Sequence, residues 1–212
     1  MDVISSQLYL CTDARTHQGD FAQFVDAAFS GGVDIIQLRD KTLEAASQLR
    51  VLEVLQDAAE RHGKLWAVND RADIAAAAGS PILHLGQDDL PLPAARTILG
   101  SRVVLGLSTH TTNQIDRAIA NSQDDYFCVG PVWATPTKPG RDAVGARLVE
   151  YAASITPGSR TWFAIGGIDL TNVEQVVQAG ARRIVVVRAI TDAKEPFGAA
   201  QALRAALPEL AR

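Results

Sequence analysis

The segment Gln37-Leu38-Arg39-Asp40-Lys41 combines an amide and two cations at the end of an apolar run. In an extended chain alternate residues share a face, so Gln37 and Arg39 point the same way. Arginine can hold two phosphate oxygens at once, and lysine adds a point charge. The segment therefore predicts an anion site. A solvated strand end, with Arg39 paired to a neighbouring carboxylate, is an alternative that the residues leave open.

Two acidic segments, Asn69-Asp70 and Gln87-Asp88-Asp89, each follow another apolar run. Proteins usually hold Mg²⁺ with one or two carboxylates together with phosphate oxygens of the substrate. Cations and carboxylates at one edge therefore predict a site for magnesium and a diphosphate. Taken singly, Asp70 could instead cap a helix that begins at Arg71, and Asp89 could shape the turn into Pro91.

Two further segments suit a second anion. The long loop Thr135–Gly140 offers hydroxyls and a lysine, and long loops in compact domains are often functional, although a plain surface loop is the alternative. Gly166-Gly167 would let backbone N–H groups approach an anion, and Val187-Arg188 follows the last apolar run. These segments suggest two phosphorylated ligands. No base–nucleophile pair is evident around His84 or His110, and we assign both histidines structural roles.

The polar segments are separated by elements typical of alternating strands and helices. Eight short apolar runs, most of them continuous as in parallel strands covered on both faces, are the predicted strands. They are Leu8–Cys11, Ile35–Leu38, Leu65–Val68, Ile82–Leu85, Val103–Leu107, Tyr126–Val129, Trp162–Ile165 and Ile184–Val187. The predicted helices are Phe21–Ser30, Leu43–Arg61, Arg71–Ala78, Pro93–Leu99, Asn113–Asn121, Val144–Ser154, Asn172–Ala179 and Glu195–Leu210.

This pattern predicts a single (β/α)₈ TIM barrel domain over residues 1–212. The competing architecture, an open doubly wound sheet, normally carries a glycine-rich loop after its first strand, whereas this chain has Thr12-Asp13-Ala14-Arg15 there. A barrel places its active site at the carboxyl ends of its strands, where the polar segments lie.

Composition narrows the classes of function. The net charge of -4 provides no bulk basic field for nucleic acid. No apolar run is long enough to span a bilayer, and the first residues lack the features of a signal peptide. Cys11 and Cys128 lie in apolar runs without other metal ligands at suitable spacing, so we expect buried free thiols and a cytoplasmic protein.

Seven stretches together closely resemble the thiamine-phosphate synthase family, in order and spacing over nearly the whole chain. They are Leu8-Tyr9-Leu10-Cys11-Thr12-Asp13, Gln37-Leu38-Arg39-Asp40-Lys41, Asn69-Asp70, His84-Leu85-Gly86-Gln87-Asp88-Asp89-Leu90, Gly106-Leu107-Ser108, Thr135-Pro136-Thr137-Lys138-Pro139 and Ala164-Ile165-Gly166-Gly167-Ile168. The resemblance implies a Mg²⁺-dependent transferase of thiamine biosynthesis. Such an enzyme joins 4-amino-2-methyl-5-hydroxymethylpyrimidine diphosphate to a thiazole phosphate, carboxylated or not, and releases pyrophosphate by a dissociative route without a general base.

The resemblance also implies residue roles. The pyrimidine diphosphate would be bound by Gln37, Arg39, Lys41, Asn69, Ser108 and Lys138, with catalytic roles for Ser108, Lys138 and Arg39. The thiazole phosphate would be bound by Thr135, Pro136, Thr137, Gly167, Val187 and Arg188, and Mg²⁺ by Asp70 and Asp89. The family often has serine where this chain has Arg188, a contact expected to be made largely by backbone.

Three rival functions remain open at this point, as does assembly into a homo-oligomer. A thiazole tautomerase resembles the synthase but would not need a complete set of diphosphate and metal residues. A non-catalytic barrel could sense a phosphorylated metabolite. A phosphate-binding barrel of amino-acid biosynthesis would need buried acid–base carboxylates, which the sequence does not reveal.

Overall fold

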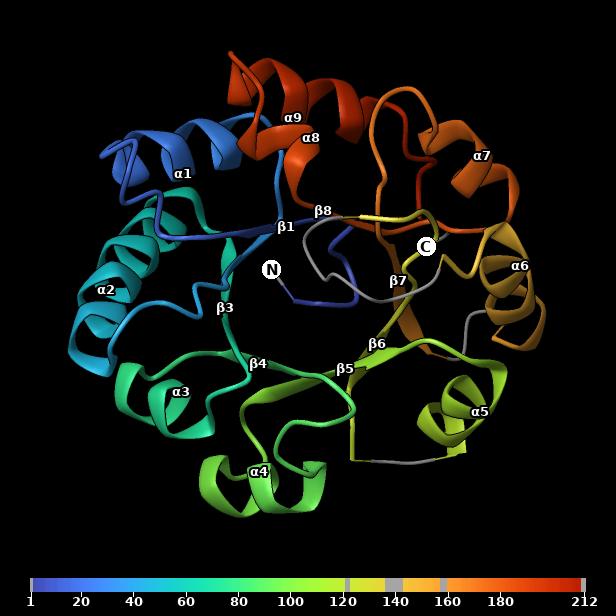
Figure 1. Cartoon of the computed structure of the whole chain (residues 1–212), viewed down its shortest axis with the longest axis horizontal. Helices are drawn as coiled ribbons and strands as arrows, with labels where there is room; N and C mark the ends of the chain where they lie inside the picture. The colour runs from blue at the N-terminus through green and yellow to red at the C-terminus, as the bar shows by residue number, and fades with distance from the viewer. Residues whose placement is uncertain (1, 121–122, 136–142, 157–159, 211–212) are drawn as a thin grey trace.

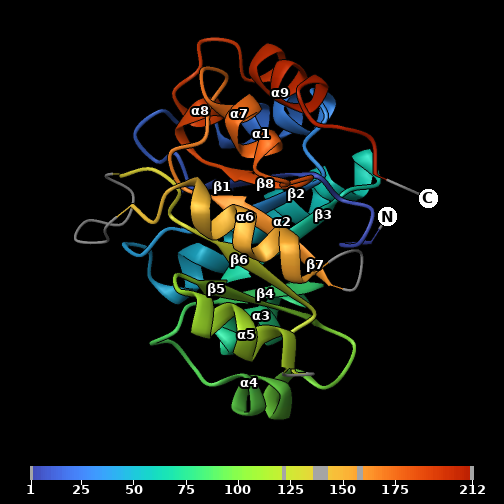
Figure 2. The same cartoon turned by 90° about the vertical axis from the view of Figure 1, so that its right-hand side faces the viewer.

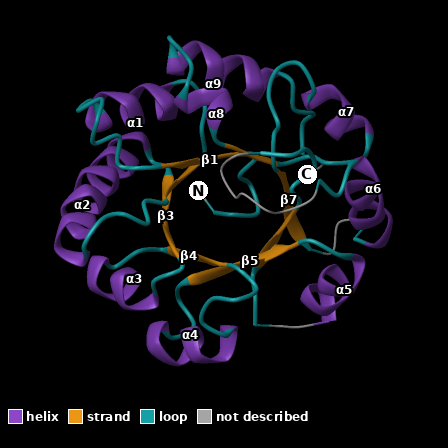
Figure 3. Ribbon diagram, viewed as in Figure 1, coloured by secondary structure: helices purple, strands orange, loops and turns teal. Residues whose placement is uncertain are grey.

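The computed structural model describes residues 2–120, 123–135, 143–156 and 160–210. Eight parallel strands close into a barrel in consecutive order, and a ring of helices surrounds it (Figures 1 and 3). The strands are β1 (Leu8–Thr12), β2 (Ile35–Leu38), β3 (Leu65–Asn69), β4 (Ile82–Leu85), β5 (Val104–Thr109), β6 (Tyr126–Val129), β7 (Thr161–Ile165) and β8 (Ile184–Val186). The predicted (β/α)₈ barrel is confirmed.

The helices lie outside the strands, as a right-handed parallel barrel requires. They are α1 (Phe21–Ser30), α2 (Ala45–His62), α3 (Ala72–Ala78), α4 (Leu92–Leu99), α5 (Thr112–Ala120), α6 (Ala146–Ile155), α7 (Val173–Gln178), α8 (Arg188–Thr191) and α9 (Pro196–Ala205). Glycine ends several of them because it adopts the left-handed conformation at low cost. Gly63 after α2 and Gly79 after α3 both have this conformation, with φ of 60° and 65°.

Two of the predicted boundaries were wrong at the end of the chain. The last strand ends at Val186, and Arg188–Thr191 forms the short helix α8, which the sequence did not predict. The last helix ends at Ala205, short of the expected Leu210, because Pro208 restricts its predecessor to extended backbone and cannot continue a helix.

Side chains of each strand alternate between two apolar clusters. Leu8, Leu10 and Ile36 pack outward against the helices in the larger cluster. Tyr9 and Ile35, by contrast, belong to a smaller cluster that fills the barrel interior. This alternation explains the continuous apolar runs, because both faces of every strand are covered.

Paired charges occupy the starts of the strands. Asp34 before β2 accepts hydrogen bonds from the backbone N–H of Gln7 (2.8 Å) and from Lys64 Nζ (2.7 Å). Asp124 before β6 pairs with Arg160 before β7 (2.6 Å). The chain enters and leaves at this end of the barrel (Figure 2). Among the described residues, no helix is long and apolar enough to cross a membrane.

Candidate active site

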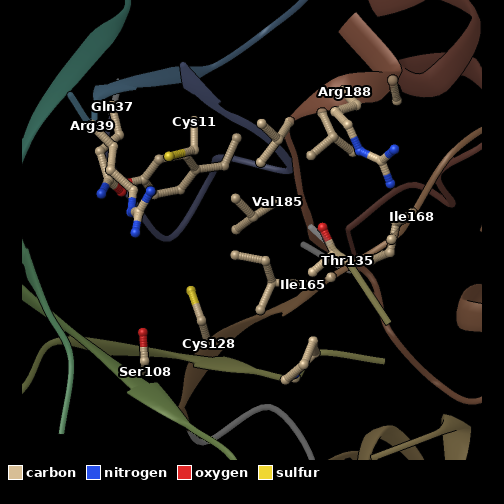
Figure 4. Close-up of a pocket in the computed structure, with 18 of the residues that line it drawn as sticks. Cys11, Gln37, Arg39, Ser108, Cys128, Thr135, Ile165, Ile168, Val185 and Arg188 are labelled. Carbon is tan, nitrogen blue, oxygen red and sulfur yellow. The ribbon is translucent and has the colours of Figure 1, made fainter. Parts of the chain in front are cut away.

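A cavity of about 240 Å³ opens among the carboxyl ends of the strands (Figure 4). It is lined by polar side chains from several strands and by glycines and apolar residues between them. The lining includes Tyr9, Cys11, Gln37, Arg39, Asn69, His84, Ser108, His110, Cys128, Thr135, Gly166, Gly167, Asp169, Val187 and Arg188. The strand ends thus gather eight of the predicted site residues around one space.

Arg39 reaches the cavity from the end of β2. Its backbone N–H continues the sheet by donating to Thr12 O (2.7 Å). The neighbouring Asp40 carboxylate accepts hydrogen bonds from the Ala14 N–H (3.3 Å) and from Thr42 (2.6 Å). Within the part of the chain that the structure describes, the half-buried Arg39 guanidinium has no hydrogen-bond or ion-pair partner. Among these residues, Arg39 is therefore not paired with a neighbouring carboxylate, and that alternative does not hold.

Asp70 follows β3 in an uncommon backbone conformation. Its φ is 62°, in the left-handed region that residues other than glycine seldom adopt. Its backbone N–H donates to His84 O (2.9 Å), and its carboxylate pairs with Lys41 Nζ (2.9 Å). Helix α3 is preceded by Arg71 as its N-cap and receives no side-chain cap, so Asp70 does not have the capping role considered above. Such local strain is concentrated at functional sites.

Asp70 and Asp89 interact directly across the ends of β3 and β4. Burial raises the pKa of Asp89, and the hydrogen bond that its protonated form donates to the neighbouring Asp70 carboxylate raises it further. Burial also opposes ionisation of Asp70, but its contacts with Asp89 and Lys41 outweigh that effect and lower its pKa. Asp89 also accepts from Gly86 N (2.7 Å), which closes the turn that precedes Pro91. Two carboxyl groups in contact hold one proton between them more readily than they both ionise.

Ser108 lies in β5 and is only 4% exposed. Its hydroxyl is 2.9 Å from His84 Nε2, and its carbonyl accepts from Gln87 Nε2 (2.6 Å). His84 is therefore part of the cavity wall and in contact with a predicted site residue. His110 contacts the carbonyl of Gly130 through Nδ1.

Gly166-Gly167 follows β7 and packs against the segment that follows β6. A side chain on Gly166 would overlap Pro131, and one on Gly167 would approach Trp133 Cβ to 2.8 Å. Both glycines also have positive φ, 104° and 68°. Close packing requires these glycines here, in addition to the open backbone that an anion would use.

Val187 and Arg188 stand where β8 passes into α8. Val187 is the N-cap of this four-residue helix, and Arg188 is its first residue. The Arg188 guanidinium faces the cavity on the side of Thr135 and Ile168, opposite Gln37 and Arg39 (Figure 4). It is exposed, and within the described ranges it has no hydrogen-bond or ion-pair partner.

The remaining predicted residues are divided. Lys41, Asp70 and Asp89 lie beside the cavity rather than in its lining, joined by their own contacts. Pro136, Thr137 and Lys138 lie outside the described residues. Tyr9, Tyr126 and His84 are among the residues not predicted as site residues, and their polar atoms are linked beneath the cavity. Tyr9 and His84 lie in the stretches that resemble the family, which was the available signal for these two.

The chain is a closed (β/α)₈ barrel. At its mouth, two guanidinium groups without partners among the described residues lie near a pair of carboxyl groups. This combination defines a barrel enzyme that handles phosphorylated ligands. The family model for thiamine monophosphate synthase matches residues 8–190. The chain therefore belongs to the thiamine-phosphate synthase family, whose members are transferases.

Individual relatives agree with this assignment. A thiamine-phosphate synthase from an Arthrobacter species is 63% identical, with 95% of this chain and 94% of the relative covered. One from Saccharopolyspora erythraea is 60% identical, with 94% and 92% covered. The structure of a thiamine phosphate pyrophosphorylase from Pyrococcus furiosus has a TM-score of 0.84 at 25% identity, covering 96% of each chain.

Proposed function

We propose that this chain joins a hydroxymethylpyrimidine diphosphate to a thiazole phosphate, carboxylated or not, and releases pyrophosphate. One observation carries the proposal. Arg39 and Arg188 face a single cavity from opposite sides, and neither guanidinium has a partner among the described residues. Two separated cations suit two anionic substrates whose uncharged parts meet between them.

The pyrimidine diphosphate would occupy the side of the cavity formed by β2, β3 and β5. Arg39 and Lys41 would bind the diphosphate, together with Lys138, which lies outside the described residues. The buried side chains of Gln37, Asn69 and Ser108 would orient the pyrimidine. The donors stand on separate strand ends, so the barrel holds them in place before the substrate arrives.

The residues at the metal position fit Mg²⁺. Asp70 and Asp89 offer hard oxygen ligands in contact with one another, and a divalent cation would relieve the repulsion that makes them share a proton. No cluster of three or more histidine, cysteine or acidic side chains suited to a metal occurs in the described residues. Asp70 and Asp89 would therefore hold the ion together with diphosphate oxygens. When bound, Mg²⁺ supplies charge stabilisation to the departing pyrophosphate.

The thiazole phosphate would occupy the opposite side. Thr135, Gly167 and the backbone of Val187 and Arg188 would surround its phosphate, with Pro136 and Thr137 of the undescribed loop. Gly167 and the start of α8 belong to the cavity lining, so their backbone N–H groups would meet an anion without obstruction by a side chain. In this placement the thiazole nitrogen would point toward the pyrimidine.

The proposed mechanism is dissociative. The bond from the pyrimidine methylene carbon to the diphosphate oxygen breaks first, and the electron pair leaves with pyrophosphate. The thiazole nitrogen then donates its lone pair to the resulting pyrimidine cation. Arg39, Lys41 and Lys138 would stabilise charge on the leaving group, which is the principal task of the site. We place the reaction in the cytoplasm, where the buried cysteines Cys11 and Cys128 would stay reduced.

The experiment that tests this proposal measures pyrophosphate release with both substrates and Mg²⁺. We expect Arg39→Ala to lower kcat/KM for the pyrimidine diphosphate, because the substitution removes roughly 2–4 kcal/mol of transition-state stabilisation. Arg102→Ala is the matched control, because Arg102 is exposed at the start of β5. Equal effects of the two variants would refute the role of Arg39. Thiazole isomerisation without pyrophosphate release would indicate a tautomerase instead.

A further inference from the structure

A chain of six buried polar side chains crosses the barrel beneath the cavity. His84 Nε2 is 2.9 Å from Ser108 Oγ, and His84 Nδ1 is 3.1 Å from the Tyr126 hydroxyl. That hydroxyl is 3.2 Å from the Tyr9 hydroxyl. Tyr9 in turn donates to Gln37 Oε1 (2.8 Å). Gln37 Nε2 completes the chain by donating to Asn69 Oδ1 (2.7 Å).

The direction of the chain is set at the Gln37 amide. This amide has a donor, Nε2, and an acceptor, Oε1, and its two neighbours in the chain contact different ends of it. Asn69 offers its Oδ1, an acceptor, to Gln37. Gln37 must then donate through Nε2, which leaves Oε1 to accept the single proton of Tyr9.

The positions of the remaining hydroxyl and imidazole protons follow from the number of donors and acceptors in the chain. Because Tyr9 has given its proton to Gln37, its oxygen must accept from the Tyr126 hydroxyl. Tyr126 then accepts from His84, so the neutral imidazole carries its proton on Nδ1. Nε2 is left as an acceptor and takes the proton of Ser108. The Ser108 oxygen can therefore offer only lone pairs to a ligand in the cavity.

Packing holds the two phenols in this arrangement. The Phe163 ring stacks edge-on against both Tyr9 and Tyr126, with centroids 5.6 Å apart in each case. Gly106 in β5 lies against the other side of Tyr126, and a side chain there would overlap the phenol ring and crowd His84 Nδ1. Its φ is not positive, so glycine is needed here for space rather than for conformation. The local sequence is thus matched to the Tyr126–His84 contact.

We propose that Tyr9 and Tyr126 are positioning residues that hold His84 as the Nδ1–H tautomer and make Ser108 an acceptor toward the substrate. The inference rests on the proposed function only in assigning Ser108 to the pyrimidine. An acceptor at Ser108 matches the amino group of an aminopyrimidine, which is a donor. A reversed chain would require the Gln37 and Asn69 amides to be turned over, against the hydrogen bonds that they make in the structure.

The proton order can be tested without any substrate. Imidazole ¹⁵N resonances distinguish the two neutral tautomers and the imidazolium, and the signals lost in His84→Gln identify His84. We expect the Nδ1–H tautomer in the wild type at neutral pH. In Tyr126→Phe, Nδ1–H loses its acceptor, so we expect conversion to the Nε2–H tautomer. An Nε2–H tautomer or an imidazolium in the wild type, or an unchanged tautomer in Tyr126→Phe, would overturn the inference.

Kinetics test the positioning role separately. We expect Tyr9→Phe and Tyr126→Phe to raise KM for the pyrimidine diphosphate about tenfold and to leave KM for the thiazole phosphate unchanged. The third tyrosine supplies a matched control, because the Tyr151 hydroxyl donates to Asp116 on the surface. Tyr151→Phe should change neither constant. No rise for the pyrimidine substrate, or an equal rise for both substrates, would refute the positioning role, whereas the tautomer measurement stands even if the site assignment fails.

Discussion

The two ends of the barrel differ in how they treat charge, although the ion pair Lys41–Asp70 also lies at the carboxyl ends. At the starts of the strands, carboxylates are matched with cations: Asp34 with Lys64, and Asp124 with Arg160. At the carboxyl ends, Arg39 and Arg188 face the cavity without partners among the described residues. The same residue types serve stability at one end and remain available to a ligand at the other. A paired buried charge resists removal, whereas an unpaired one lowers its energy when an anion arrives.

The comparison predicts that the largest loss of stability comes from the paired end. Asp34 is 3% exposed and accepts from two backbone N–H groups as well as from Lys64. We expect Asp34→Ala to lower the free energy of unfolding by about 3–5 kcal/mol, because it leaves buried N–H groups and the partly buried Lys64 cation unpaired. Urea unfolding measures this loss. The exposed Arg71–Asp73 pair is the control, and Asp73→Ala should cost at most about 1 kcal/mol. Similar losses would contradict the prediction.

The carboxyl groups at the other end should affect turnover instead. We expect Asp70→Ala or Asp89→Ala to lower turnover at least a hundredfold, about 2.7 kcal/mol, while the protein stays folded. Rates measured against Mg²⁺ concentration, with melting curves for each variant, test this. Asp88→Ala removes an exposed neighbouring carboxylate and should have little effect. Wild-type rates with an unchanged Mg²⁺ dependence would eliminate the metal role.

Asp124 makes the paired end sensitive to pH. Burial raises the pKa of this carboxyl from 3.8 to about 6, although Arg160 opposes the shift. One of its oxygens, Oδ1, has no hydrogen-bond partner among the described residues. A carboxyl with a raised pKa binds its proton more tightly in the folded state, so stability falls as the pH rises from about 4 to 6 and then levels off.

We expect the free energy of unfolding of the wild type to fall by roughly 1–3 kcal/mol from about pH 4 to pH 6 because of Asp124. This fall should be absent in Asp124→Asn. The measurement is the free energy of unfolding at a series of pH values, taken as the difference between the two proteins. Profiles that run parallel from pH 4 to pH 7 would show that Asp124 titrates normally.

Arg188 offers the smallest and most selective test. If its guanidinium contacts the thiazole phosphate, Arg188→Ser should raise KM for that substrate several-fold, about 1 kcal/mol, and leave KM for the pyrimidine diphosphate nearly unchanged. Arg182→Ser is the matched control, because Arg182 is an exposed arginine at the opposite end of β8. An unchanged thiazole constant would mean that the backbone alone binds the phosphate.

Much of the fold could be predicted because the signals are local. Apolar runs such as Ile35–Leu38 and Tyr126–Val129 coincide with β2 and β6, and glycines end the helices that precede several strands. The helix α8 escaped prediction because its four residues are too few to show periodicity. Its position nevertheless decides which way the backbone of Val187 and Arg188 faces.

The sequence did not predict which residues pair with the site residues. Arg39 stands next to Asp40, yet Asp40 is engaged by Ala14 and Thr42. Lys41 instead meets Asp70, which is distant in the chain. Sequence neighbours on a strand point to opposite faces, so adjacency says little about pairing.

The sequence by itself determined the strands and most of the helices, and that the polar segments follow the strands. It did not say which faces of the continuous apolar runs, such as those with Tyr9 and Tyr126, turn inward. Only closure of the barrel brought β1 next to β8 and set the two phenols 3.2 Å apart across its interior. Local propensity acts over a few residues, whereas the direction of a hydrogen-bond chain depends on every partner around a closed ring. The proton on His84 is therefore a property of the tertiary structure.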